Sequence, residues 1–308
     1  MRAITQTRFG GTEVLEQVTV PDPEPAAGEV LVRTGAIGVN PLDVAVREGW
    51  YPMIGEPPFT LGWDVAGTVE ALGEGVTDFA VGDRVFGMPR LPGAGNTYAE
   101  KVVVPATDLL ATPDSLDDVH AAALPLVALT AYRSIVEVAG LQPGQRVLVQ
   151  AAGGGVGHVA VQLAKALGAE VVATASAGKV DFVRGLGADQ VIDYREQDFT
   201  TLLSDLDLVI DPFGGESVER SLAVVRDGGV VASLLDVREE DVVAAKERGV
   251  VLNRIRIVPS RTALQAFVDL IDSGRLAVHV AGTFALDQAG AAHDELGRGV
   301  AGKLVLIP

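Results

Sequence analysis

The 308-residue sequence contains no cysteine, which excludes disulfides, thiol nucleophiles, iron–sulfur clusters and zinc sites built on cysteine. No stretch approaches the roughly 18 consecutive apolar residues that a membrane-spanning helix needs. Residues 1–17 lack the charged start and apolar run of a signal peptide. We therefore expect a cytoplasmic protein.

Basic residues are scarce: 24 Lys and Arg stand against 41 Asp and Glu, which gives a net charge of −17. A surface this acidic repels phosphate backbones and anionic lipids, so we expect no nucleic-acid or membrane partner. A small anionic ligand in a locally basic pocket is still compatible with this charge. The composition, 48% hydrophobic and 21% charged, is that of a globular chain, and the length favours two domains.

The N-terminal third is rich in short β-branched runs separated by proline and glycine. Such punctuation predicts an irregular β domain with long loops, and strands are expected over residues 29–39, 60–72 and 83–88. From Asp117, small and apolar residues at helical spacing predict a helix that ends at Gly140.

Beyond residue 145, strand and helix patterns alternate, which indicates a parallel, doubly wound α/β sheet. We expect a β domain formed by both chain ends, residues 1–123 and 261–308, with a nucleotide-binding domain over residues 124–260 inserted between them. Strands are predicted at 146–151, 170–176, 190–194, 206–214, 230–236 and 251–258, and helices at 156–168, 177–187, 216–226 and 260–273.

A glycine turn follows the first of these strands. Residues 152–157 fill the G-x-G-x-x-G frame with alanine in the first position, between a strand and a helix. Gly154 would let the backbone approach a pyrophosphate at the helix N-terminus, and Gly157 would let the helix pack closely on the strand. Gly155 and Val156 complete the predicted cofactor-binding turn. The alternative is a purely structural turn of an ordinary α/β domain.

The end of the second strand indicates which dinucleotide binds. NAD-selective folds place Asp or Glu there to bind the ribose 2′-hydroxyl, but this chain has Ala175, followed by Ser176 and Lys179. A carboxylate would repel a 2′-phosphate, whereas hydroxyl and ammonium groups bind it. Tyr194 and Arg195, after the next strand, could close the same pocket. We predict NADP (NADPH); the alternative is that Lys179 is a solvated helix residue.

Several further motifs accompany the glycine turn in a fixed order: Gly38–Asp43 (GVNPLD), Leu61–Gly67 (LGWDVAG), Gly82–Val85 (GDRV), Leu129–Tyr132 (LTAY), Gly187–Asp189 (GAD), Val191–Tyr194 (VIDY) and Gly302–Leu306 (GKLVL). With them, the sequence resembles the zinc-independent branch of the medium-chain dehydrogenase/reductase superfamily, the quinone oxidoreductase and enone reductase group, over essentially its whole length. The resemblance implies a GroES-like β domain and a Rossmann domain, with the active site in the cleft between them. It also implies a dimer or tetramer, and we expect a homodimer. Residues 251–258 are a candidate strand for pairing across the dimer, or an ordinary sheet edge.

The sequence departs from the zinc-dependent branch of that superfamily. There a Cys stands in place of Asn40 and a His-Glu pair in place of Trp63-Asp64. The four histidines show no paired ligand spacing: His120, His158, His279 and His293. Since zinc needs converging N and S ligands, we expect no metal. A hydride acceptor must then react without a strong Lewis acid, which suits quinones and α,β-unsaturated carbonyls.

The resemblance places Asn40 and Tyr51 on loops lining the cleft and Thr130 near the nicotinamide. The Asn40 amide, the Tyr51 hydroxyl or a cofactor ribose hydroxyl could bind the developing oxyanion, with a proton from solvent or Tyr51. We count Asp43 with Asn40 and Tyr51 as candidate catalytic residues. The structural alternatives are a turn cap for Asn40, a half-buried loop aromatic for Tyr51 and a helix N-terminal residue for Asp43.

Two loops follow strand ends of the doubly wound sheet, where such sheets bind ligands. They are residues 211–215 and 233–236, and we expect Phe213 and Leu235 in them to meet the nicotinamide half of the cofactor. The sequence thus predicts an NADPH-dependent, metal-free reductase of quinones or activated C=C bonds. The alternatives are an NADPH-binding sensor or structural protein with little catalysis, and an enoyl reductase acting on carrier-bound acyl groups.

Overall fold

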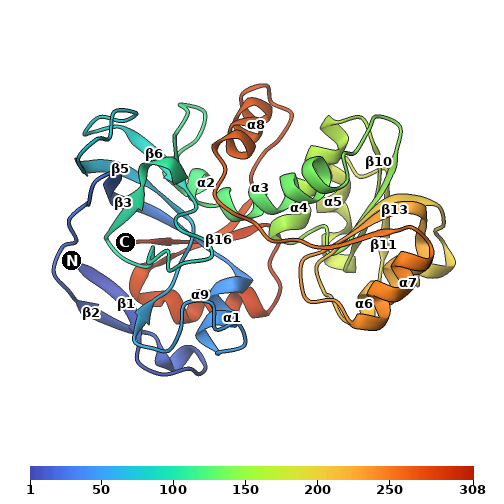
Figure 1. Cartoon of the computed structure of the whole chain (residues 1–308), viewed down its shortest axis with the longest axis horizontal. Coiled ribbons are helices and arrows are strands. Elements are labelled where there is room, and N and C mark those ends of the chain that lie inside the picture. The colour runs from blue at the N-terminus through green and yellow to red at the C-terminus, as the bar shows by residue number, and fades with distance from the viewer. The chain divides into compact units, whose positions relative to one another are not determined.

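The computed structural model describes every residue from Met1 to Pro308, and its contacts separate the chain into two units (Figure 1). Unit 1 comprises Met1–Leu129, Val258–Asp272 and Val278–Pro308; unit 2 comprises Thr130–Ile257 and Ser273–Ala277. The sequence pattern predicts domain boundaries after residues 123 and 260. In the structure, the boundaries between the units lie at Leu129–Thr130 and Ile257–Val258.

Unit 2 is built on a six-stranded sheet with the order β11-β10-β9-β12-β13-β14, in which all neighbours are parallel. Counted along the chain this order is 3-2-1-4-5-6, so the predicted doubly wound sheet is confirmed. Its valine-rich central strands are buried on both faces, as a sheet covered by helices requires, whereas the two edge strands are partly exposed. The strands are β9 (Arg146–Val149), β10 (Glu170–Ala175), β11 (Gln190–Asp193), β12 (Leu206–Asp211), β13 (Val225–Ser233) and β14 (Val251–Arg254).

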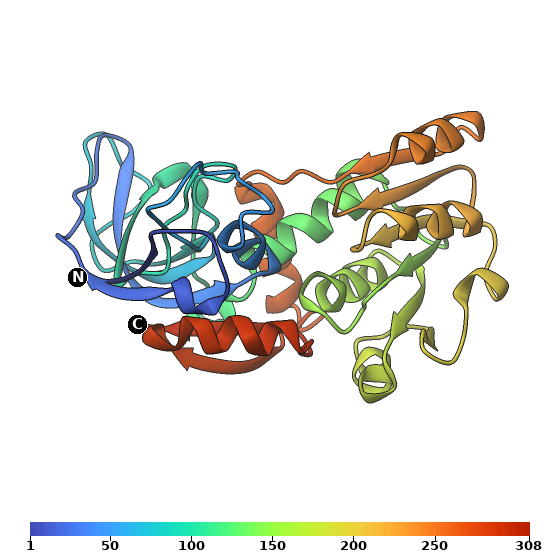
Figure 2. The ribbon, with the colours of Figure 1, turned by 90° about the horizontal axis from the view of Figure 1, so that it is seen from below.

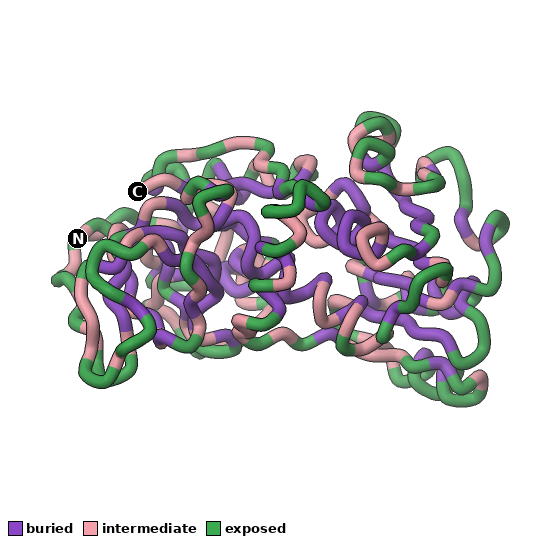
Figure 3. Tube along the Cα trace, turned by 90° about the horizontal axis from the view of Figure 1, so that it is seen from above, coloured by how far each residue is buried: buried purple, intermediate pink, exposed green.

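The helices of unit 2 pack on this sheet, and Figure 3 shows buried segments inside the unit with exposed segments around them. Helix α4 packs on β9 and β10, and residues 157–164 of this helix are buried on all sides. The helices are α4 (Gly155–Ala166), α5 (Val180–Gly185), α6 (Glu216–Val224) and α7 (Glu239–Glu247). Sequence analysis did not predict α7.

Unit 1 contains a larger, mainly antiparallel sheet that joins the two ends of the chain. The eleven-residue strand β3 pairs with β5 and β7 and also with β16, close to the C-terminus. The β domain predicted from both chain ends is therefore confirmed. One sheet has the order β15-β16-β3-β5-β6-β8, with β7 on β3, and a second sheet has the order β2-β1-β4. The strands are β1 (Arg2–Gln6), β2 (Glu16–Thr19), β3 (Glu29–Val39), β4 (Phe59–Thr60), β5 (Val65–Leu72), β6 (Arg84–Gly87), β7 (Lys101–Pro105), β8 (Leu109–Ala111), β15 (Val280–Ala285) and β16 (Lys303–Ile307).

The single helix expected between Asp117 and Gly140 is interrupted. Pro125 has no N–H for a helical hydrogen bond, so one helix ends before it and the next begins at it. Residues Arg133–Val138 then form a π-helix, and Gly140 ends the segment in the left-handed region with φ +56°. The α-helices outside unit 2's sheet layers are α1 (Pro41–Arg47), α2 (Asp118–Ala122), α3 (Pro125–Tyr132), α8 (Arg261–Asp272) and α9 (Ala289–Gly297).

The tail of the chain contains one element that sequence analysis missed. Helix α9 packs on β15 and β16 at the edge of the unit 1 sheet, and Figure 2 shows it running along these strands. Ala289, Ala292 and His293 are its buried residues. None of the helices in this structure combines the length and the apolar character that crossing a bilayer would demand.

Candidate functional site

The glycine turn joins the end of β9 to the start of α4, beside the strand pair β9–β12 at which the order of the sheet reverses. Gly154 precedes the first helical residue, and its N–H donates to Ala151 O at 2.9 Å. A Cβ at Gly157 would lie 2.4 Å from Ala151 O, so only glycine permits this close packing. A Cβ at Gly154 would meet only that oxygen, at 3.3 Å. The turn and the first N–H groups of α4 thus fit a diphosphate.

A chain of buried polar groups supports this turn. Gln150 Nε2 donates to Ser221 Oγ at 2.9 Å, and the Ser221 hydroxyl donates to Asp211 Oδ2 at 2.9 Å. Asp211 Oδ1 accepts the backbone N–H groups of Phe213 (2.8 Å) and Gly214 (3.1 Å). The turn after β9 is therefore tied to the loop after β12. Sequence analysis missed Gln150 and Ser221; their only sequence signal is polarity within apolar segments.

The two predicted nicotinamide loops lie against each other. Phe213 follows β12 and Leu235 follows β13, and their side chains are 57% and 52% exposed, although both are large and apolar. A Cβ at Gly214 would lie 2.8 Å from Leu235 Cβ. The structure therefore brings Phe213 and Leu235 together at the carboxyl ends of neighbouring strands. Their contact with nicotinamide stays a prediction.

Ser176 and Lys179 share one short turn after β10. Ser176 precedes the 3₁₀ helix Ala177–Lys179, and Lys179 N–H donates to Ser176 O at 2.8 Å. The stem of Lys179 packs on the glycine turn, because a Cβ at Gly153 would lie 2.8 Å from Lys179 Cδ. Partial burial of the ammonium group lowers the pKa of Lys179. The turn thus holds a hydroxyl and a cation beside the glycine turn.

Tyr194 adjoins this turn from the neighbouring strand. Its N–H donates to Ala175 O at 3.2 Å, and the Arg195 guanidinium lies 5.8 Å from the centroid of its ring. The nearest strand-end carboxylate, that of Asp193, accepts the Arg195 N–H at 3.0 Å. Ser176, Lys179, Tyr194 and Ala175 are therefore neighbours, as the NADP prediction requires. Thr130 lies elsewhere in unit 2, buried on α3, where its carbonyl oxygen accepts from Ser134 Oγ at 2.8 Å.

In unit 1, Asn40 is fully buried immediately before α1. Its Nδ2 donates to Asp64 Oδ2 at 2.9 Å and to Gly38 O at 3.4 Å, and its Oδ1 accepts from the Lys303 ammonium group. In this arrangement the amide holds its neighbours and presents no free donor. Asn40 stands at the start of α1, where the structural alternative of a turn cap expects it, and its role in catalysis stays a prediction.

Asp43 is also fully buried, in the first turn of α1. Its Oδ2 accepts Asn40 N–H at 2.7 Å and the Tyr98 hydroxyl at 3.1 Å, whereas Oδ1 has no hydrogen-bond partner. Burial raises the pKa of Asp43 to about 7, against the opposing effects of the Asn40 N–H and the Lys303 ammonium. Asp43 is therefore a helix N-terminal residue held in a polar cluster.

A hydrogen-bonded chain that sequence analysis missed leads to Asp43. Arg47 donates to His293 Nδ1 at 2.9 Å, so Nε2 carries the proton and donates to Tyr98 Oη at 2.9 Å. The Tyr98 hydroxyl in turn donates to Asp43. Burial, together with the Arg47 charge, lowers the pKa of His293 to about 3. The imidazole is therefore neutral with a fixed tautomer.

Tyr51 differs from Asn40 and Asp43 because its side chain reaches the surface in part. It follows α1, and the backbone N–H groups of Trp50 and Tyr51 both donate to Ala45 O, at 2.9 and 3.2 Å. Trp50 is 80% exposed. Of the three candidate catalytic residues, only Tyr51 is exposed in part, and its contact with a substrate stays a prediction.

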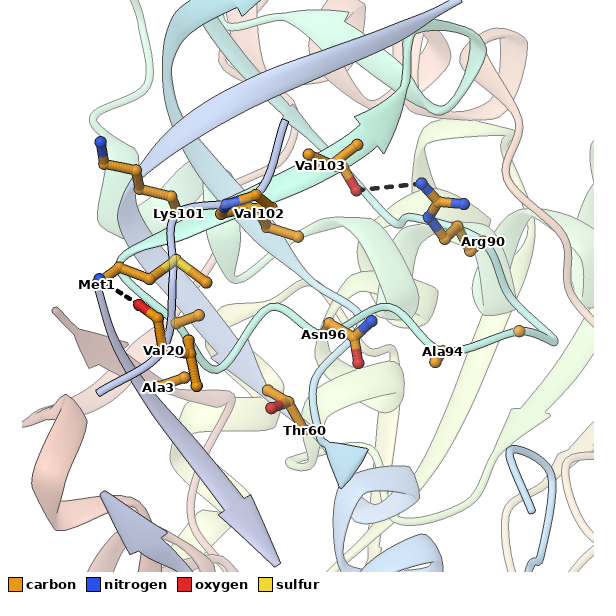
Figure 4. Close-up of a pocket in the computed structure, with 13 residues that line it drawn as sticks. Met1, Ala3, Val20, Thr60, Arg90, Ala94, Asn96, Lys101, Val102 and Val103 are labelled. Atoms are coloured by element: carbon orange, nitrogen blue, oxygen red, sulfur yellow. Dashed lines mark hydrogen bonds between the residues drawn. The ribbon is translucent and has the colours of Figure 1, made fainter. Parts of the chain in front are cut away.

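Unit 1 also has an open hollow of about 700 Å³, shown in Figure 4. Its three cations are already paired: the N-terminal ammonium of Met1 with Asp22, Arg90 with Glu29, and Lys101 with Asp22 and Glu70. None of the candidate site residues lines it, and its walls are Met1, Ala3, Val20, Pro23, Thr60, Arg90, Gly93, Ala94, Asn96, Ala99, Lys101, Val102 and Val103. The hollow holds no carboxylate, histidine or tyrosine.

A GroES-like β unit combined with a doubly wound unit that carries a glycine turn defines the class of dinucleotide-dependent dehydrogenases and reductases. Family models agree with this class: an alcohol dehydrogenase GroES-like domain matches residues 26–114, and a zinc-binding dehydrogenase model matches residues 186–306.

Similar proteins are found among reductases. The 2-haloacrylate reductase of a Burkholderia species is 36% identical, covering 96% of this chain and 95% of its own length. Human quinone oxidoreductase is 31% identical, covering 100% and 98%. A polyketide synthase of Streptomyces orinoci contains a segment that is 36% identical to 96% of this chain, which spans only 14% of that protein.

Solved structures agree over the whole chain. The quinone oxidoreductase from Coxiella burnetii has a TM-score of 0.95 at 31% identity, covering 100% of this chain and 99% of that one. Escherichia coli quinone oxidoreductase, solved in complex with NADPH, has a TM-score of 0.92 at 31% identity, covering 100% of both. The chain therefore belongs to the medium-chain dehydrogenase/reductase superfamily, in its quinone oxidoreductase group, and is an oxidoreductase.

Proposed function

We propose that this chain is an NADPH-dependent, metal-free reductase that transfers hydride to quinones or to activated C=C bonds of α,β-unsaturated carbonyls. The glycine turn carries the proposal, because it presents backbone amides at α4 with Lys179 packed over Gly153. The NADPH complex of the E. coli relative supports the cofactor. The names quinone oxidoreductase and 2-haloacrylate reductase among the relatives support the class of acceptor.

The residues around Ala175 favour NADPH over NADH. The end of β10 carries no carboxylate to bind a free ribose 2′-hydroxyl, and Lys179, Ser176 and Tyr194 surround the position. The Lys179 ammonium pairs with the 2′-phosphate, and the Ser176 hydroxyl donates to it. The fit of these residues to a phosphorylated ribose is the basis of the preference.

When bound, NADPH supplies a hydride from its nicotinamide ring. The residues of the chain bind the cofactor, orient the acceptor and handle the proton. The Tyr51 hydroxyl donates a hydrogen bond to the acceptor oxygen on which negative charge develops, and the proton comes from Tyr51 or from solvent. Asn40 and Asp43 act indirectly, by holding α1 and the backbone around Tyr51.

Steady-state oxidation of NADPH tests the proposal. We expect turnover with 1,4-benzoquinone or 2-chloroacrylate that is unchanged by EDTA, and weaker use of NADH. Tyr51→Phe keeps the ring and removes the hydroxyl, so it should lower kcat roughly 10- to 100-fold with little change in the Kd of NADPH. Absence of turnover across a panel of quinones and enones would contradict the proposed activity and favour a sensor or structural role.

A second candidate function is reduction of enoyl groups attached to a carrier protein. The match to a polyketide synthase segment over nearly the whole chain favours it. Comparing an enoyl thioester on a phosphopantetheinylated carrier with the same thioester on a small thiol separates the two. A kcat/KM that is far higher on the carrier would favour this candidate over the free quinone or enone.

We also propose a homodimer. β14 is an edge strand of the unit 2 sheet, and Val251 and Val258 at the two ends of its segment are exposed apolar side chains. An unpaired strand edge offers backbone N–H and C=O groups to a second copy. Location in the cytoplasm stays a prediction.

A further inference from the structure

Lys303 on β16 is buried inside unit 1, with 3% of its surface exposed, although lysine is rarely buried without a partner. Its ammonium group donates to Val39 O at 2.9 Å, to Asn40 Oδ1 and to Asp64 Oδ2 at 3.3 Å. An ammonium group has three N–H donors, so these three oxygen atoms satisfy it completely.

The ammonium group contacts one buried carboxylate, that of Asp64, and its charge also acts on a second, that of Asp43. Asp64 Oδ2 accepts from Lys303 and from Asn40 Nδ2, and Asp64 Oδ1 accepts the N–H of Leu126 at 2.8 Å. Asp43 is the second carboxylate. Burial raises the pKa of both carboxyl groups, and the positive charge of Lys303 opposes the rise at both. One cation thus compensates the acidic cluster.

A divalent metal does not fit these residues, although one of the matching family models is described as zinc-binding. Asn40, Trp63 and Asp64 stand where the zinc-dependent branch has Cys and a His-Glu pair. Trp63 is buried, and its Nε1–H donates to Gly93 O at 2.8 Å, so the indole cannot act as a ligand. The ammonium group of Lys303 already occupies the oxygens of Asn40 and Asp64. No group of three or more His, Cys, Asp or Glu residues in the structure is arranged to hold a metal ion.

We propose that the buried ammonium group of Lys303 does in unit 1 what a bound metal ion would do. It binds the oxygen atoms of Asn40 and Asp64 and so holds these two side chains together. Lys303 is then a positioning residue for the proposed reaction. Through Asn40 it fixes the start of α1, whose Ala45 carbonyl oxygen binds the Tyr51 N–H.

Through Asp64, Lys303 also fixes Leu126 in the first turn of α3, the helix that continues to Thr130. Two elements that carry candidate site residues therefore depend on one buried charge. Only the kinetic part of this inference rests on the proposed function; its effect on stability is independent of any activity.

Moving the negative charge from position 64 to position 40 tests the proposal. Asn40→Asp alone adds a carboxylate to the cluster, and Asp64→Asn alone removes the carboxylate that faces Lys303. In the double variant, the carboxylate at position 40 accepts from Lys303 and from the new amide at position 64, whose oxygen still accepts the Leu126 N–H. Three of the four hydrogen bonds among these groups are kept, and the 3.3 Å bond from Lys303 to position 64 is lost because the amide nitrogen there cannot accept it. The long 3.4 Å bond from position 40 to Gly38 O is lost as well.

We expect each single variant to lower the thermal unfolding midpoint by roughly 10 °C, and the double variant to recover at least half of the loss. Lys101→Met, which removes a more exposed lysine of the same unit, is the matched control and should change the midpoint little. If the decrease in the midpoint of the double variant equals the sum of the decreases of the two single variants, the proposal is overturned.

Kinetic measurements and a metal titration distinguish a positioning role of Lys303 from a purely structural role. The double variant should have a higher kcat than either single variant, whereas folded Lys303→Met should lose roughly tenfold or more in kcat with the Kd of NADPH unchanged. Cobalt(II) added to the wild-type protein should give no stoichiometric ligand-field absorption. Such absorption, or full kcat in Lys303→Met, would overturn the proposal. If the wild type reduces no acceptor, the proposed function fails, and the stability cycle still decides the role of Lys303.

Discussion

Lys179 is the residue on which the proposed coenzyme preference depends most. Its stem is fixed against Gly153, so its ammonium group meets a 2′-phosphate without first losing much side-chain freedom. Lys179→Met keeps the stem and removes the charge. We expect the Kd of NADPH to rise roughly 10- to 100-fold and that of NADH to stay within about twofold, as measured by fluorescence titration.

Lys246→Met is the matched control for this variant, because Lys246 is an exposed lysine on α7 of the same unit. It should leave both dissociation constants unchanged. Equal losses for NADPH and NADH in Lys179→Met would contradict a 2′-phosphate contact.

His293 gives a pH dependence whose sign follows from its neutral state. Its pKa is about 3 in the folded protein, against the ordinary histidine value of 6.5, so between these two pH values the unfolded chain binds the extra proton. Its contribution to stability is present above pH 6.5 and is lost as the pH falls toward 3. The free energy of unfolding of the wild type minus that of His293→Gln should therefore increase from about pH 4.5 to 6.5, as measured by urea denaturation.

Asp43 supplies the control of opposite sign for the His293 variant. Its pKa of about 7 lies above the ordinary aspartate value of 3.8, so its contribution to stability is lost as the pH rises through 7. The free energy of unfolding of the wild type minus that of Asp43→Asn should therefore decrease between about pH 4.5 and 6.5. If the difference in free energy of unfolding between the wild type and His293→Gln does not change with pH, the imidazole of His293 is not buried in its neutral form.

At the scale of single residues, the sequence identifies candidate site residues better than it identifies their hydrogen-bond partners. Ser176, Lys179 and Tyr194 were predicted together because each follows a strand end of a recognisable sheet. The role of Asn40 could not be predicted in this way, since its partner Lys303 is 263 positions away and approaches only through the pairing of β16 with β3. His293 and Tyr98, 195 positions apart, were missed for the same reason.

At the scale of elements, the turn between β9 and α4 contains two glycines with different tasks. A Cβ at Gly157 would collide with the backbone of Ala151 and Ala152, whereas one at Gly154 has room. Gly157→Ala should therefore lower the free energy of unfolding by about 1–3 kcal/mol, as measured by urea denaturation.

Gly154→Ala should instead leave the stability nearly unchanged and weaken NADPH binding roughly tenfold or more, because a methyl group enters the space of the diphosphate. The two variants serve as controls for each other. Normal NADPH affinity in Gly154→Ala would place the diphosphate elsewhere.

Two elements show where pattern-based prediction fails. Helix α7 carries Val242 and Val243 on its exposed side and buries only Asp241 and Ala245, so it has no apolar stripe to detect. In the segment before Gly140, apolar spacing continues through Pro125, but the missing N–H of proline divides it into α2 and α3. The alternating strands of unit 2 were predictable because valine-rich runs and glycine stops recur there.

At the scale of the whole molecule, the edge strand β14 determines the expected assembly. Val251→Lys places a charge on this edge, which should prevent pairing with a second copy. We expect light scattering to give the mass of two chains for the wild type and of one chain for the variant. Val81→Lys, at an exposed valine of unit 1, is the control and should stay dimeric. A wild-type protein with the mass of one chain would contradict the homodimer.

The overall architecture was predictable because motif order carries it along the whole chain. GVNPLD and LGWDVAG belong to the β domain, the glycine turn to the doubly wound sheet, and GKLVL to the returning strand β16. What these motifs do in detail was less predictable. The lysine of GKLVL is buried against Asp64, which only the folded sheet reveals.

The connection of Lys303 to Asp64 has a consequence for protein synthesis. The ribosome makes Asp64 239 positions before its ammonium partner, an interval on the order of tens of seconds. All of unit 2 emerges during that interval, while the nascent β unit still carries uncompensated carboxylates. Co-translational folding should therefore begin with the nucleotide-binding half, and the first-made segment should be the one that chaperones hold longest.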